Sequence, residues 1–104
     1  MQITIADNDA GLTTVDAKNA VRKTIDLVGK LKYIEHRHVK SETGYETVFK
    51  GFEGEILLKG GFSSGYNGEG PRGLKAILLE LGFNESIIDE HVFGEAKQFR
   101  LEVK

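Results

Sequence analysis

The chain has 104 residues, of which 39% are hydrophobic and 29% charged, with a formal net charge of -2 and no cysteine. This length and composition predict one globular domain spanning residues 1–104. Without cysteine the chain forms no disulfide and offers no thiolate to a metal or a substrate. The nearly balanced charge makes nucleic acid an unlikely partner. No apolar run approaches the roughly 20 residues that cross a bilayer, and no signal-peptide pattern is present, so we expect a cytoplasmic protein without a membrane partner.

The first half of the chain predicts a strand, a helix and then three strands. Residues 1–5 read as a short strand. Thr13 is suited to cap a helix, with Asp16 at the capping-box position, and apolar residues at helical spacing extend this helix over residues 14–30. Three strands are expected over residues 31–40, 45–50 and 55–59. Their short connections favour antiparallel pairing, because a parallel crossover needs a dozen or more residues.

The second half predicts a long helix, a short helix and a last strand. Apolar residues at helical spacing, Leu74 to Leu81, precede Gly82 at the position of a helix C-terminal glycine. Asn84 is suited to cap a short helix that stops near Gly94, and residues 99–103 alternate as in a half-buried strand. The predicted fold class is therefore α+β, a mainly antiparallel four- to five-stranded sheet with two main helices and one short helix packed on it.

Residues 60–73, GGFSSGYNGEGPRG, hold six of the thirteen glycines and the only proline, immediately before the long helix. Pro71 suits the first turn of that helix, so the preceding backbone N–H groups would lie at its positive end, where anions bind. Arg72 and Lys75 would add positive charge, and the ring of Tyr66 could stack on a base. The predicted ligand-binding residues are Gly65, Tyr66, Gly68, Gly70, Arg72 and Lys75.

Two other interpretations of this segment bear on its function. Residues 68–73 satisfy the dinucleotide spacing G-x-G-x-x-G, but about eight residues separate them from the preceding strand, so we reject a Rossmann site. The glycines could instead build a compact surface loop, held to the core by Phe62 and Tyr66, with Pro71 starting the helix. The sequence leaves the ligand site and the structural loop both open.

The pattern GF-x-x-GY-x-G-x-GP, from Gly61 to Pro71 and followed by the apolar helix, resembles a motif of small, functionally unassigned bacterial and phage-related proteins. The similarity covers about 20 residues. The chain departs from the motif at Ser64, where an aromatic residue is expected, and at Asn67, where glycine is expected. No activity comes with this resemblance, so it marks the segment as a unit without implying a reaction.

No arrangement of side chains specifies a reaction, so we interpret the protein as a binding protein rather than an enzyme, with no catalytic residue, metal ligand or cofactor predicted. His36 and His38 are spaced to project from one face of a strand, as zinc ligands can, but two exposed histidines are the commoner case. Our first hypothesis is a small non-enzymatic protein, phage-related by its motif, that binds a phosphate-bearing nucleotide or nucleotide-derived signal. The alternative is a protein interaction module or inhibitor that binds a protein partner, or a second copy, through the loop or an exposed strand of the meander over residues 31–59.

Overall fold

The computed structural model describes residues 1–6, 13–39, 44–65, 68–94 and 98–103. Its elements in chain order are β1 (Gln2–Ala6), α1 (Thr14–Thr24), the 3-10 helix η1 (Ile25–Val28), β2 (Leu31–Val39), β3 (Gly44–Gly51), β4 (Glu55–Lys59), α2 (Glu69–Glu80), α3 (Glu85–Val92) and β5 (Phe99–Glu102). These elements confirm the predicted α+β class. None of the helices in the described ranges is long and apolar enough to cross a membrane.

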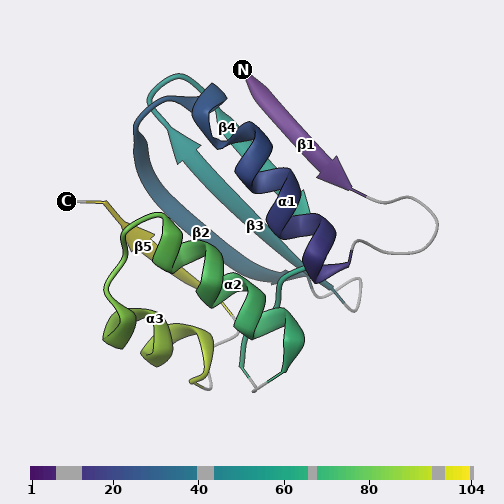
Figure 1. Ribbon diagram of the computed structural model, residues 1–104, viewed down its shortest axis with the longest axis vertical. Helices are drawn as coiled ribbons and strands as arrows, with labels where there is room; N and C mark the ends of the chain where they lie inside the picture. Colours follow the sequence, from purple (N-terminus) through teal and green to yellow (C-terminus); the bar gives the residue numbers. More distant parts are fainter. Residues whose placement is uncertain (7–12, 40–43, 66–67, 95–97, 104) are drawn as a thin grey trace.

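The described strands form one sheet in the order β1-β4-β3-β2-β5. The pair β1 and β4 is parallel, and the other three neighbouring pairs are antiparallel. The predicted meander is confirmed, and its strands β2, β3 and β4 occupy the interior of the sheet. The two sheet edges therefore belong to β1 and β5, which the sequence did not reveal. The helices all lie on one face, in front of the sheet in Figure 1, and the opposite face is left open.

Alternation along each strand separates the two faces. On β2, Ile34 and His36 are fully buried beneath the helices, whereas Tyr33, Glu35 and Arg37 lie on the open face and are partly exposed. The core forms between these inward positions and the apolar stripes of α1 and α2. It includes Ala17, Val21, Ile34, Phe49, Ile56, Leu58, Phe62, Leu74, Ile77, Leu78, Ile88 and Val92. Each fully buried aliphatic or aromatic side chain of this kind stabilises the fold by roughly 1.5–3 kcal/mol.

The helix ends follow the local signals in the sequence. The Thr13 hydroxyl accepts a 3.0 Å hydrogen bond from the Asp16 backbone N–H, and the Asn84 side chain accepts from Ser86 and Ile87 at 2.9 and 3.3 Å. After α2, the N–H of Phe83 donates to the Leu78 carbonyl at 3.1 Å and that of Gly82 to Leu79 at 3.0 Å, a Schellman motif. The predicted caps of all three α-helices are thus confirmed within the described chain.

One helix boundary differs from the prediction. The first helix does not continue to residue 30 as an α-helix but ends at Thr24, and η1 leads to Gly29, whose φ of 73° turns the chain into β2. The long helix begins at Glu69, so Pro71 lies in its first turn as predicted, and Gly70 and Gly73 pack closely there. The expected hairpin at residues 41–44 lies mostly outside the described residues.

Candidate functional site

The glycine segment connects β4 to α2 along a path that uses backbone conformations open mainly to glycine. Gly60, Gly61 and Gly65 have φ values of 87°, 80° and 88°. The N–H of Gly60 donates to the Tyr45 carbonyl at 2.8 Å, and that of Gly65 donates to the Val92 carbonyl at 2.9 Å. These two N–H groups are therefore used within the fold. Phe62 is buried in the core, as the structural interpretation of the segment predicts.

Close packing accounts for two further glycines of the motif. A Cβ atom at Gly70 would overlap the hydroxyl of Ser63, and one at Gly73 would overlap the methyl group of Thr14. The hydroxyl of Thr14 in turn donates to the Gly61 carbonyl at 2.8 Å. These contacts hold the start of α2 against the glycine segment and the start of α1. Much of the glycine content thus has a structural reason.

The structure separates the two cations of the predicted site. The ammonium of Lys75 lies 2.8 Å from the Asp89 carboxylate, 3.0 Å from that of Glu85, and over the Phe93 ring at 5.7 Å. Hydrogen bonds to Asp89 and then Glu85 raise the pKa of Lys75 above its ordinary value. Lys75 therefore joins α2 to α3, whereas Arg72 is exposed beside α1. Tyr66 lies outside the described residues.

A pocket of about 340 Å³ lies where α1 and α2 begin. The two helices run side by side in the same direction (Figure 1), so their N-termini meet at one end of the helical layer. The pocket is lined by Thr14, Val15, Lys18, Glu69, Arg72 and Gly73. Of the predicted ligand-binding residues it contains Arg72, while Gly68 is the N-cap of α2 and Gly70 lies in its first turn. Lys18 is the cation that sequence reasoning missed at this site, because only the packing of α1 on α2 brings it there.

Positive charge dominates this pocket. Each helix N-terminus carries the equivalent of roughly half a positive charge, and Lys18 and Arg72 add full charges. The Nε of Arg72 donates to the Gly68 carbonyl at 3.1 Å, while its terminal nitrogens have no partner among the described residues. Gly68 provides no side chain to cap α2, and among the described residues Glu69 is the one carboxylate that lines the pocket. The arrangement suits an anion that approaches the backbone of the first helical turn.

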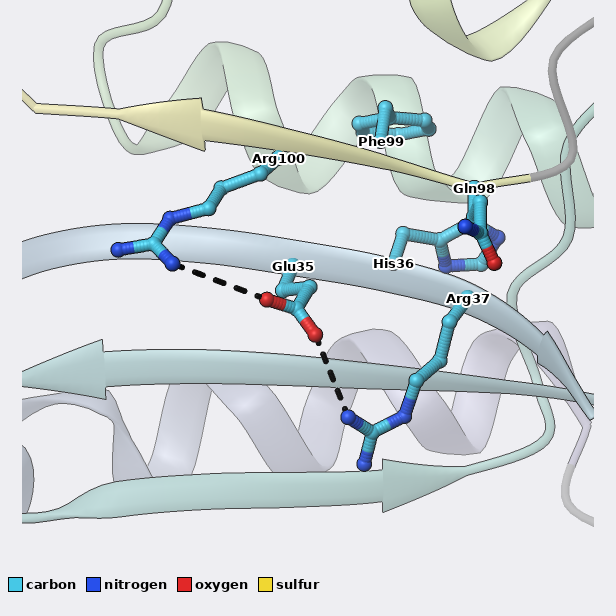
Figure 2. Close-up of a pocket in the computed structure, with 6 residues that line it drawn as sticks. All are labelled: Glu35, His36, Arg37, Gln98, Phe99 and Arg100. Carbon is cyan, nitrogen blue, oxygen red and sulfur yellow. Dashed lines mark hydrogen bonds and ion pairs between the residues drawn. The ribbon is translucent and has the colours of Figure 1, made fainter.

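A second pocket, of about 350 Å³, lies at the open face where β2 and β5 meet. Figure 2 shows Glu35 between the guanidinium groups of Arg37 and Arg100, at 3.3 and 4.0 Å. Arg37 also contacts Glu46 at 3.1 Å, and Arg100 contacts Glu102 at 3.3 Å. Because Arg37 and Arg100 each contact two carboxylates already, this pocket is less suited to an anion than the pocket between the helix N-termini.

His36 also lines the second pocket and is fully buried, contrary to the expectation of an exposed histidine. Its Nδ1 lies 2.8 Å from the Thr47 hydroxyl, its ring stacks on Tyr45 at 5.1 Å, and its Nε2 has no partner among the described residues. Burial lowers the pKa of His36 to about 4, so the ring is neutral at physiological pH. Tyr45 also contacts the ring of His38. In the described part of the chain, no group of three or more histidines and carboxylates is arranged to hold a metal ion.

Comparison with other proteins finds no matching family model, curated protein or solved structure for this chain.

Proposed function

We propose that the protein is a non-enzymatic binding protein that holds a phosphate-bearing ligand in the pocket between the N-termini of α1 and α2. The observation that carries this proposal is the meeting of two helix N-termini with Lys18 and Arg72 around one opening. A phosphate there would receive charge from both helices and two side chains. Phosphate groups bind well at helix N-termini because backbone N–H groups point toward them.

The dimensions and chemistry of the pocket favour a nucleotide-sized ligand. A volume of about 340 Å³ lies at the lower end of the range of small-molecule sites, roughly 300–1,000 Å³. The Thr14 hydroxyl is committed to the Gly61 carbonyl, which favours binding over nucleophilic chemistry at this side chain. A nucleotide or nucleotide-derived signal remains the ligand class we favour. Sequestration of such a signal suits a small protein whose motif resembles those of phage-related proteins, an argument by analogy alone.

Thermal unfolding in the presence of inorganic phosphate, mononucleotides, cyclic dinucleotides and ADP-ribose tests the proposal. A ligand at one hundred times its dissociation constant stabilises the native state by about 2.7 kcal/mol. We expect one phosphate compound to raise the melting temperature, and both Arg72→Ala and Lys18→Ala to abolish that shift. Glu69→Gln should strengthen binding, because it removes a competing negative charge from the first turn of α2.

Lys23→Ala is the matched control, since Lys23 is an exposed cation near the other end of α1. It should leave the ligand shift unchanged. The proposal is wrong if no phosphate compound shifts the melting temperature, or if a shift survives in both pocket variants.

The alternative, a protein interaction module or inhibitor, has a specific observation in its favour. The expectation of an exposed strand within the meander is wrong, because β2, β3 and β4 are all interior, but the sheet leaves β1 and β5 as edges for pairing. An interaction through a sheet edge would not require the helix N-terminal pocket, and pocket variants would leave it intact.

A further inference from the structure

Among the described strands, β5 lies at an edge of the sheet, and its outer side presents backbone groups that none of them uses. The N–H of Val103 donates to the Lys32 carbonyl at 2.9 Å. In an antiparallel ladder, alternate residues direct their N–H and C=O groups to the same neighbour, so Leu101 and Phe99 also bond to β2. The backbone groups of Arg100 and Glu102 therefore point outward, away from the sheet.

The side chains of these two outward-bonding residues carry opposite charges. Arg100 and Glu102 both lie on the open face, with side chains 48% and 71% exposed, and they contact each other at 3.3 Å. Leu101 between them is buried on the helix side. Natural edge strands are often protected by short length, exposed charged side chains, proline, bulges or inward-pointing charges. β5 is short and its two outward-bonding residues are charged, but their charges are opposite, so they repel an identical strand only in some registers. The four residues of β5, Phe99–Glu102, contain neither proline nor an inward-pointing charge.

We propose that β5 pairs with β5 of a second copy of the chain, antiparallel and about a twofold axis at Leu101. Charge selects this register. Residues whose backbone groups point outward have to face each other across the two copies. The twofold registers that satisfy this within β5 place Arg100 opposite Arg100, Glu102 opposite Glu102, or Arg100 opposite Glu102. The first two place like charges directly opposite, which is destabilising, whereas the third forms two pairs of opposite charge.

The third register satisfies the backbone hydrogen bonds and the side-chain contacts together. Arg100 of each copy exchanges backbone hydrogen bonds with Glu102 of the other, which gives four bonds around the axis. On the helix side, Leu101 faces its own equivalent and Phe99 faces Val103. The side chain of Val103 is 37% exposed in the single chain, so pairing would shield it.

An apolar groove beside this edge supports association on the same side. It has a volume of about 370 Å³, and its lining includes Phe83, Ile87 and Val103. Ile87 is 44% exposed. A second copy placed along β5 would adjoin this groove and remove apolar surface from water, which favours association. The dimer would hold one continuous sheet formed by both copies.

Charge reversal at the two edge residues tests the pairing by sedimentation equilibrium. The wild-type protein should have twice the monomer mass of 11.5 kDa. Arg100→Glu would face Glu102 and Glu102→Arg would face Arg100, so each variant alone should dimerise about tenfold or more weakly. An equimolar mixture of the two variants should form heterodimers, because every facing pair then has opposite charges. The double variant R100E/E102R should recover self-association.

Thr4→Glu is the matched control, since Thr4 is exposed on β1 at the opposite edge, and it should leave the dimer intact. Thermal melts establish that each variant folds. A wild-type protein that sediments as a monomer at its highest soluble concentration overturns the proposal. So does a dimer that survives both single reversals, or variants that do not associate when mixed. None of these measurements needs a phosphate compound, so their outcome is independent of the proposed ligand site.

Discussion

Arg22 and Glu80 form a two-point ion pair that joins the C-terminal regions of α1 and α2. The Nε and a terminal nitrogen of the guanidinium lie 2.9 and 2.6 Å from the two carboxylate oxygens. The contact spans 58 positions of sequence and holds the helices side by side in the same direction. The same alignment brings their N-termini together at the proposed ligand pocket.

The Arg22–Glu80 pair should make a small, pH-dependent contribution to stability. The hydrogen bond from Arg22 lowers the pKa of Glu80 below its ordinary value of 4.5, so the contribution is present above pH 4.5 and is lost as the pH falls through the lowered pKa. We expect Glu80→Gln to melt below the wild type at neutral pH and the difference to shrink in acid. Both side chains are exposed, so the effect should also diminish in high salt.

Glu90→Gln provides the control for this pair, because Glu90 is exposed and has no ion pair among the described residues. Its melting difference from the wild type should be small at every pH. A Glu80→Gln difference that stays constant from neutral to acid pH would show that the ionised carboxylate is not what holds the helices.

Burial of His36 should make the fold sensitive to mild acid. Its pKa falls from an ordinary 6.5 to about 4, so the unfolded chain binds the proton more readily between these values. The contribution of neutral His36 to the free energy of unfolding is fully present above pH 6.5. It decreases by about 3 kcal/mol as the pH falls toward 4. Urea unfolding across this range should show the decline, and the double variant H36F/T47V should lack this part of it.

The double substitution avoids leaving the Thr47 hydroxyl buried without its partner. His38→Phe is the control, and it should retain the decline because His36 stays in place. If the double variant and the wild type lose stability in parallel between pH 6.5 and 4, the acid sensitivity comes from other groups.

The start of α2 should tolerate a larger residue at position 73 only if Thr14 becomes smaller. Alanine normally stabilises a helix relative to glycine, but Gly73→Ala would press its Cβ against the methyl group of Thr14. We expect a loss of about 1–3 kcal/mol, as for other overpacked sites. The double variant G73A/T14S removes that methyl, keeps the hydroxyl, and should recover most of the loss in urea unfolding.

Gly44→Ala is the appropriate comparison, since a Cβ there meets no atom within 4 Å. That variant should unfold close to the wild type. A similar loss in both glycine variants, or no recovery in G73A/T14S, would contradict the close-packing explanation.

Lys75 should stabilise the fold and should not contribute to ligand binding. Lys75→Met removes its ion pairs to Glu85 and Asp89 and should lower the melting temperature of the free protein. Because these partners lie on α3, away from the α1 side of α2, the affinity for a phosphate compound should stay within about twofold. Calorimetric titration of this variant beside Arg72→Ala distinguishes the roles of the two cations. Equal losses of ligand affinity in both variants would show that Lys75 also takes part in ligand binding.

The local parts of this fold were predictable because their interactions are local. The side chains of Thr13 and Asn84 bond to backbone groups two or three positions ahead, and the bonds around Gly82 also span few residues. Residue type and spacing therefore suffice to place these helix ends. The strands of the meander were predictable for a related reason, since short connections leave little choice but antiparallel neighbours.

The separation of Arg72 and Lys75 shows where this reasoning stops. Three positions apart on one helix, they were expected to serve one anion. The structure instead turns Lys75 toward the carboxylates of α3, while Arg72 lies beside α1 with Lys18. Which neighbour attracts a flexible cation depends on how the helices pack, and sequence spacing contains no information about that.

The sequence by itself determined the class of fold, the three helices with their caps, and a glycine segment that leads into α2. Only the tertiary structure decided the strand order, the burial of His36 and the edge position of β5. Tyr33 pairs with Glu102 in that sheet, although residues 34–101, most of the chain, lie between them. Such pairing reflects the competition of many long-range contacts for the same core, so it is fixed only when the whole chain folds.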